Sequence, residues 1–252
     1  MKTTIRLAAS IGLAAVLATS SLSAFASGDS NTYVLNALQA VSGLENNTIA
    51  DVLSNRSLGL GSDDKNTSVR FDNGATQVEI PFDARDGISM HSSKGYFTLE
   101  LPFASRAMRA EKLADGLVVF DNLNGTYTAP VVKTDGSIAI TNVLTSVNAA
   151  NTFEYRFGLP KGVRLVLDAS TGAVDAVDAK GAWVAGVATP WARDARGADV
   201  PTRFELNGNS LTQVVATRSN AFAYPIVADP WFGMSLIQKQ HGQSRSGHGA
   251  PL

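Results

Sequence analysis

AYPIVADPWFG, residues 223–233, is the last part of the chain in which strand-forming residues, prolines and aromatic residues come together. Pro225 fixes its own φ, lacks an N–H donor and biases Tyr224 towards an extended conformation. Proline within a strand is confined to sheet edges, strand starts and bulges. The segment is therefore predicted to be a final edge strand, or the lead-in to one.

The second half of this segment carries signals that end the strand. Asp229 before Pro230 favours a turn, and its carboxylate can accept hydrogen bonds from nearby amides. Trp231 and Phe232 can then fold back over the open edge or end of the core, which would protect an edge that is otherwise prone to pairing. The segment is predicted to be both the end and the lid of the folded domain.

Upstream of this segment, apolar and polar residues alternate in the manner of half-buried β-strands. The alternating stretches lie at residues 69–71, 78–80, 97–101, 117–119, 138–140, 153–157, 163–167, 184, 204–206 and 214. Many short strands at this spacing predict a mainly β chain, folded as an antiparallel sandwich or barrel. We expect an antiparallel β-sandwich over residues 63–233.

Turn signals separate the alternating stretches and support hairpin connections. They are Asn73-Gly74, Asp86-Gly87, Asp115-Gly116, Asn124-Gly125, Asp135-Gly136, Thr171-Gly172, Lys180-Gly181 and Asn207-Gly208. Asn-Gly and Asp-Gly pairs supply the positive φ that two-residue hairpin turns need. One stretch, Ala104–Gly116, contains helix formers without alternation, so a short helix or a crossing loop is expected there.

The sandwich is preceded by a segment with helical periodicity, residues 29–55. Its apolar residues recur at helical spacing: Val34, Leu38 and Val41. Residues 29–31 can cap the start, and Asn47 can cap a second short turn. LGLGSDDKNTS, residues 58–68, is rich in Gly, Ser and Asp and is typical of a linker. Residues 27–62 are therefore predicted to be a helical segment and linker, with the helix packed on its own domain.

The chain begins with a segment that has the three parts of a secretory signal peptide. Lys2 and Arg6 give it a positive start, and Ile11–Leu17 is a short apolar stretch. Ala24-Phe25-Ala26 matches an A-x-A cleavage site. The apolar stretch is too short for a membrane anchor, and no later stretch approaches the spanning length. Residues 1–26 are predicted to be cleaved after Ala26, which leaves a secreted, extracellular protein without a membrane span.

The composition of the chain and its polar C-terminal end indicate which classes of binding partner are expected. The chain has no cysteine, so a secreted form must be held by its core alone, which suits a bacterial exporter. Its formal net charge of −1 argues against a nucleic-acid partner. Residues 234–252 contain no acidic residue and are predicted to be a disordered polar tail. Lys239 and Arg245 of this tail could contact an anionic wall polymer, or the tail could be idle.

The chain offers few groups for catalysis. Of its three histidines, His91 lies in a turn-like stretch and the other two lie in the polar tail, so a Ser–His–Asp triad has little support. Four glutamates between apolar strand residues are expected on solvated faces rather than across a cleft: Glu79, Glu100, Glu154 and Glu205. Asp168–Gly172 lacks the terminal Glu of a Ca²⁺ loop, so a hairpin turn is expected. No catalytic, cofactor or metal site is predicted.

A set of residues near the end of the sandwich carries a resemblance to a known family: Pro190, Asp194, Gly197, Tyr224, Pro225, Asp229 and Pro230. In this pattern the chain resembles secreted Gram-positive, mainly actinobacterial, β-rich proteins whose folded part closes with a Y-P-V-V-A-D-P motif. It is also similar to the strand-rich module ahead of the repeats in wall-associated YD-repeat toxins. The resemblance covers about residues 69–230 and implies a shared module without a catalytic set. Some small members resemble bacteriocin precursors, but the tail here lacks the apolar helix of a membrane-active peptide.

These observations lead to two hypotheses about function. We expect a secreted, non-catalytic β-sandwich protein that serves as a cell-surface or extracellular binding or carrier module, including a bacteriocin-like factor or its proregion. The expected partners are cell-wall polymer or a target-cell surface. The alternative is an extracellular hydrolase that acts on wall polymer, glycan or peptide. The scarcity of histidine and the absence of cysteine and of recognised catalytic motifs favour the first hypothesis.

Overall fold

The computed structural model describes six parts of the chain, residues 27–42, 52–53, 55–57, 67–114, 116–217 and 221–234. The predicted signal peptide, most of the predicted linker, the turn capped by Asn47 and the polar tail after residue 234 lie outside the described residues. The structure is mainly β and consists of two antiparallel sheets with one helix, α1 (Ser27–Ser42), near the start of the described residues. Among these residues, no helix is both long and apolar enough to cross a bilayer.

The smaller sheet has seven strands within the described residues. Their order across the sheet is β1 (Thr67–Asp72), β2 (Thr76–Pro81), β3 (Ile88–Ser92), β4 (Gly95–Glu100), β9 (Thr152–Gly158), β15 (Ser210–Val215) and β14 (Thr202–Asn207). A single-turn 3₁₀ helix, η1 (Ala84–Asp86), connects β2 to β3. Every pair of neighbouring strands in this sheet is antiparallel.

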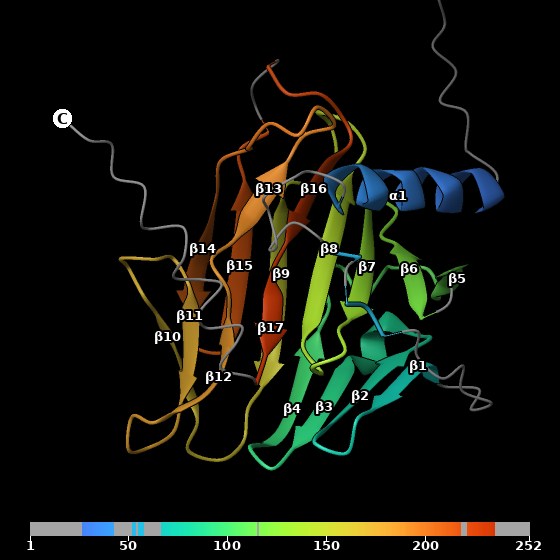
Figure 1. Cartoon of the computed structure of the whole chain (residues 1–252). Coiled ribbons are helices and arrows are strands. Elements are labelled where there is room, and N and C mark those ends of the chain that lie inside the picture. Colours follow the sequence, from blue (N-terminus) through green and yellow to red (C-terminus); the bar gives the residue numbers. More distant parts are fainter. Residues whose placement is uncertain are drawn as a thin grey trace, which may run out of the picture.

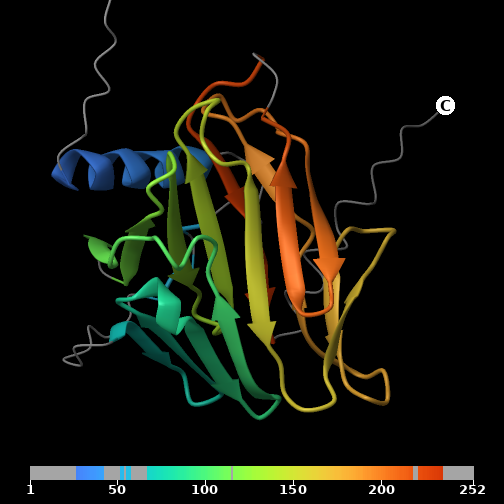
Figure 2. The ribbon, with the colours of Figure 1, turned by 180° about the vertical axis from the view of Figure 1, so that it is seen from behind.

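The larger sheet has ten strands in the same part of the chain. Its main order is β10 (Arg164–Leu167), β11 (Val174–Val177), β12 (Trp183–Val187), β17 (Trp231–Gly233), β8 (Ile138–Leu144), β7 (Thr126–Val132), β6 (Leu117–Asp121) and β5 (Glu111–Ala114). Beside this path, β13 (Trp191–Arg193) pairs with β16 (Ile226–Asp229), which also pairs with β8. Figures 1 and 2 show the two sheets as the layers of a sandwich, so the predicted fold class is confirmed.

The main core fills the space between the sheets because each strand sends alternate side chains inward. β9 shows the pattern most clearly: Phe153, Tyr155 and Phe157 are buried, and the residues between them are exposed. Phe232 of β17 meets this layer from the other sheet, with its ring centroid 5.2 Å from that of Phe157 and 5.8 Å from that of Phe97. Aromatic contacts of this kind join the two sheets near their centres.

The outer face of the larger sheet is covered by α1, which lies across the strands at one end of the sandwich (Figure 1). Val34, Leu38 and Val41 of the helix pack on Val143 and Val227 of the sheet. Leu53 and Trp231 extend this cover; all seven residues of β8 and four of the five residues of β6 are buried. These contacts confirm the prediction that the helix packs on its own domain.

The closing segment of the sandwich differs from the prediction. β16 and β17 do not form an edge: they lie between β8 on one side and β12 and β13 on the other. Pro225 precedes the first residue of β16, so its missing N–H does not interrupt the ladder. Pro230 separates two short strands that both pair with β8, and its carbonyl accepts the Ile140 N–H at 3.0 Å.

The aromatic pair of this segment does not form a lid, because the two side chains point to opposite faces of the sheet. Phe232 lies in the main core, whereas Trp231 packs on the cluster beneath α1. The Trp231 indole N–H donates to Ser137 Oγ at 2.7 Å, and the Lys133 ammonium lies 5.3 Å from the ring centroid. The segment therefore completes the sheet instead of shielding its edge.

Three smaller predictions are also corrected, and the turn prediction is confirmed. Residues 104–110 cross from the smaller sheet to the larger one without a helix, as the loop alternative predicted, but residues 111–114 form the strand β5, because they pair with β6. His91 lies within β3, and β1 already begins at Thr67 inside the predicted linker. All eight glycines of the predicted turn pairs have positive φ: Gly74, Gly87, Gly116, Gly125, Gly136, Gly172, Gly181 and Gly208.

Candidate functional site

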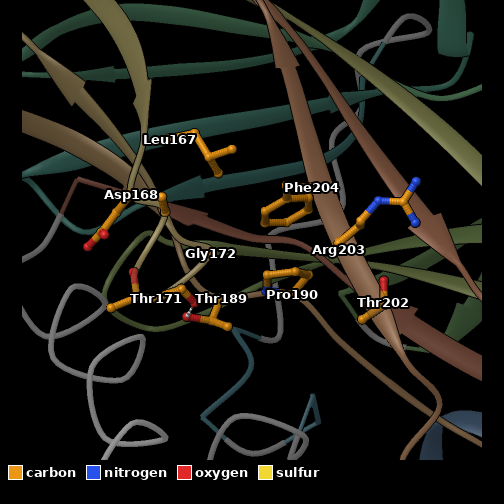
Figure 3. Close-up of a pocket in the computed structure, with 10 residues that line it drawn as sticks. Leu167, Asp168, Thr171, Gly172, Thr189, Pro190, Thr202, Arg203 and Phe204 are labelled. Atoms are coloured by element: carbon orange, nitrogen blue, oxygen red, sulfur yellow. Dashed lines mark hydrogen bonds between the residues drawn. The ribbon is translucent and has the colours of Figure 1, made fainter.

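A concave surface feature lies at one open side of the sandwich, where β10 ends the larger sheet and β14 ends the smaller one. These two edge strands contact each other, and a cleft of about 250 Å³ opens beside them. Its lining residues are Leu167, Asp168, Ala169, Thr171, Gly172, Thr189, Pro190, Thr202, Arg203 and Phe204. We call this feature the edge cleft; Figure 3 shows its side chains.

The apolar part of the edge cleft comes from three different segments. Leu167 closes β10, Pro190 precedes β13, and Phe204 is the third residue of β14. Phe204 and Pro190 are buried, whereas Leu167 is 36% exposed although it is a large apolar residue. In Figure 3, Leu167 and Phe204 face the same hollow, so a ligand side chain placed there would cover apolar surface.

Hydroxyl groups surround this apolar part and are held by backbone carbonyls. The Thr189 hydroxyl donates to the Thr171 carbonyl oxygen at 2.9 Å, which ties the β10–β11 hairpin to the segment before β13. The Thr202 hydroxyl donates to the Val214 carbonyl oxygen at 3.0 Å. The Thr202 hydroxyl oxygen also accepts the side-chain amide N–H of Gln213 at 3.2 Å, so these hydroxyl groups hold the segments around the edge cleft together.

Charge at the edge cleft is unbalanced. The Asp168 carboxylate accepts hydrogen bonds from the Ser170 amide at 2.9 Å and hydroxyl at 2.6 Å, which lowers the pKa of Asp168 to about 2. Asp168 has no salt bridge among the described residues, whereas Arg203 pairs with the exposed Glu205 of its own strand. The two charged groups point away from the Phe204 ring on opposite sides in Figure 3. The rim formed by Asp168 is therefore negative, and the turn is a hairpin, as predicted.

The β14–β15 hairpin leaves a regular backbone edge next to the cleft. Gly208, with φ of 57°, supports the two-residue connection between Asn207 and Ser210. The Ala216 amide donates to the Pro201 carbonyl oxygen at 2.9 Å, so the odd-numbered residues direct their backbone groups towards β15. Because the ladder alternates, the backbone groups of Thr202, Phe204 and Leu206 point to the outer edge of the sheet.

The motif residues take structural positions away from the edge cleft, except Pro190. Asp194 is buried and accepts the backbone N–H groups of Arg196, Ala198 and Ala223 at 2.9 Å each. The Arg196 side chain also donates to Asp194 and to the Ala221 carbonyl. Despite burial, these donors lower the pKa of Asp194. Asp194 therefore fixes the turn after β13 and anchors the chain that enters β16.

Asp229 is the other motif carboxylate, and it is fully buried opposite Trp191 in the β13–β16 pair. Neither carboxylate oxygen has a hydrogen bond of good geometry among the described residues. Burial raises the pKa of Asp229 to about 7, and the opposing influences of Lys133, the Ile140 amide and the Trp191 indole do not overcome it. Asp229 is 1% exposed and does not line the edge cleft.

The residues considered for catalysis are separated on the outer face of the smaller sheet. His91 is exposed, and the four glutamates lie on β2, β4, β9 and β14 at solvated positions, as predicted. Three of these glutamates pair with arginines of the same face: Arg70 with Glu79, Arg156 with Glu154, and Arg203 with Glu205. Within the described ranges, no three metal-ligating side chains come together.

Sequence reasoning missed the edge cleft because its three apolar residues lie far apart in the chain. The alternation places Leu167 and Phe204 on inward faces, but the order of strands decides that β10 and β14 are edges on the same side. The chain matches no protein-family model, no curated protein and no solved structure.

Proposed function

We propose that the protein is a secreted, non-catalytic binding module whose ligand site is the edge cleft. The single observation that carries this proposal is the meeting of two edge strands around exposed Leu167, with buried Phe204 and Pro190 beneath it. Large apolar side chains at the rim of a concave site mark surfaces that a ligand covers. A rigid double sheet holds these side chains, since both strands are anchored in continuous ladders.

An extracellular or cell-surface location is part of the proposal. It is supported by the leader-like residues 1–26 and by a core that needs no disulfide, because the chain has no cysteine. The resemblance of the closing motif to secreted Gram-positive proteins supports the same location. The partners that fit this location are molecules of the medium, the wall or a target-cell surface.

Binding tests can use a panel of peptides, glycans and wall polymers with the full chain and two matched variants. Leu167→Asp puts a charge into the edge cleft, while Val147→Asp puts the same charge on an exposed apolar residue outside it. We expect Leu167→Asp to lose binding to any member of the panel that the unaltered chain retains, and Val147→Asp to keep it. Equal binding by both variants, with equal melting temperatures, would remove the edge cleft as the site.

A further inference from the structure

We propose that the edge cleft binds an extended peptide that adds to β14 as a further strand, with an apolar side chain in the cleft and a basic side chain near Asp168. This inference rests on the proposed binding function and names its ligand class. Three features of the described residues carry it: the backbone of β14, the size of the cleft and the charge of its rim.

The backbone of β14 is the most regular edge of the two sheets. Four strands end the two main strand paths in the described residues, β1, β5, β10 and β14, and the three-residue β13 beside the path also pairs with one strand only. The ladders of β1 and β5 contain register shifts, and β10 has four residues. β14 has six residues in unbroken register with β15. A long edge without a bulge is the template onto which another strand pairs.

β14 carries the charged side chains Arg203 and Glu205 on its solvated face, but it lacks other devices that usually protect such an edge. It contains no proline or lysine, and its inward residues, Phe204 and Leu206, are apolar rather than charged. The backbone groups that point away from β15 belong to residues whose side chains face the core, such as Phe204. A peptide residue that forms hydrogen bonds with Phe204 would therefore also direct its side chain towards the core. That side chain would lie between β14 and β10, where the edge cleft opens.

The size of the edge cleft fits part of a long ligand. Pockets that enclose a drug-sized molecule usually have volumes of about 300–1,000 Å³, whereas this cleft has about 250 Å³. Its walls include two runs of three consecutive residues, 167–169 and 202–204, which lie at the ends of the two edge strands. A site of this kind accommodates one side chain while main-chain hydrogen bonds hold the rest of the peptide.

The charge of the rim selects among peptides. Asp168 is negative at all ordinary pH values because its pKa is about 2, and it has no salt bridge among the described residues. Arg203 is already paired with Glu205. A carboxylate without a salt bridge beside an apolar cleft complements a cationic residue of the peptide. If this cationic residue and the apolar residue in the cleft point to the same face of the added strand, they are two positions apart in the peptide.

A defined probe tests this inference: the fluorescent peptide Ac-Thr-Val-Thr-Leu-Thr-Lys-Thr-amide, titrated into the full chain. Methylation of the leucine backbone nitrogen removes an N–H directed at β14, whereas methylation of the preceding threonine nitrogen removes one directed at solvent. We expect the first change to weaken binding about tenfold, in line with the loss of a main-chain hydrogen bond, and the second to leave it nearly unchanged. Asp168→Asn should weaken the lysine probe but not a norleucine analogue.

Amide hydrogen exchange gives a second, direct readout. In the free chain the Phe204 and Leu206 amides should exchange faster than those of Arg203 and Glu205, and the peptide should protect the first pair. No binding of the probe, or equal effects of the two methylations, would overturn strand addition. If the peptide probe fails but Leu167→Asp still abolishes binding of a glycan or wall polymer, the edge cleft remains a binding site and only the proposed addition of a peptide strand is wrong.

Discussion

At the scale of single residues, Asp229 makes the stability of the protein depend on pH. Its carboxyl is fully buried, and its pKa rises from 3.8 to about 7. The charge of Lys133 lowers this pKa. Burial, and to a smaller extent the charge of Asp229, raises the pKa of the nearby Tyr155 hydroxyl. An acid with a raised folded-state pKa stabilises the fold fully below its unfolded pKa, and that contribution is lost as the pH rises through about 7.

The corresponding prediction is that Asp229→Asn flattens the dependence of stability on pH. A shift of this size corresponds to a free-energy change on the order of 4 kcal/mol between pH 4 and pH 7. The neutral amide cannot ionise, so the variant should gain stability relative to the unaltered chain as the pH rises. Urea unfolding at several pH values in this window measures the difference.

Asp168→Asn is the control for this experiment, because the pKa of Asp168 is lowered and not raised. Its stabilising effect is present above the unfolded pKa of 3.8 and is lost as the pH falls towards about 2. Asp168→Asn should therefore give a constant offset between pH 5 and pH 8. A pH dependence of Asp229→Asn that is parallel to the unaltered chain would contradict the raised pKa.

Asp194 leads to a second residue-scale prediction. Asp194→Ala leaves three backbone N–H groups without their acceptor, and charged hydrogen bonds contribute about 1.5–3 kcal/mol each. We expect a loss of about 3 kcal/mol or more in the free energy of unfolding, because these bonds hold the entry to β16. Asp199→Ala removes an exposed carboxylate that pairs with Arg193, and should change stability by less than about 1 kcal/mol. Similar losses in the two variants would argue against the anchoring role.

At the scale of elements, α1 is the cover that lets the larger sheet be apolar on both faces. Leu38 is fully buried in the cluster that joins the helix to Val143 and Val227. Leu38→Ala should lower the free energy of unfolding by about 2–5 kcal/mol, the usual range for a buried leucine. Gln39→Ala, on the exposed side of the helix, should have little effect. Chemical denaturation of both variants measures the contrast.

Much of the fold follows from local pattern, but the arrangement of the strands does not. Alternation and turn glycines predict most of the strands, and helical spacing predicts α1, because these signals depend on neighbours in the chain. The positions of β16 and β17 could not be predicted, since proline at a strand start looks the same at an edge and in a sheet centre. The edge cleft could not be predicted either, because only the order of strands brings Leu167 and Phe204 to the same side of the sandwich.

At the scale of the whole molecule, β16 and β17 join two parts of the larger sheet. They connect β10–β13 on one side to β8 and its neighbours on the other. A chain stopped after Thr217 lacks both strands, loses buried Phe232 and leaves one edge of β8 unpaired. We expect it not to reach the native fold, since loss of one large aromatic alone costs about 3–5 kcal/mol. Circular dichroism and melting of the purified chain measure this.

A chain stopped after Met234 is the matched control for that truncation. It keeps every described strand and removes only residues 235–252. We expect its melting temperature to equal that of the full chain. A large drop in melting temperature would show that the predicted polar tail contributes to the fold, and equal melting of both truncated chains would show that the joining strands are dispensable.

The central position of β16 and β17 also determines when the larger sheet can be completed during protein synthesis. The ribosome makes the chain from its N-terminus, and both parts of the larger sheet are made before the strands that lie between them. A growing chain therefore cannot close the larger sheet until residue 233 has left the ribosomal tunnel. We therefore expect the complete fold, and the resistance to proteases that comes with it, to form in one late step after β17 has been made.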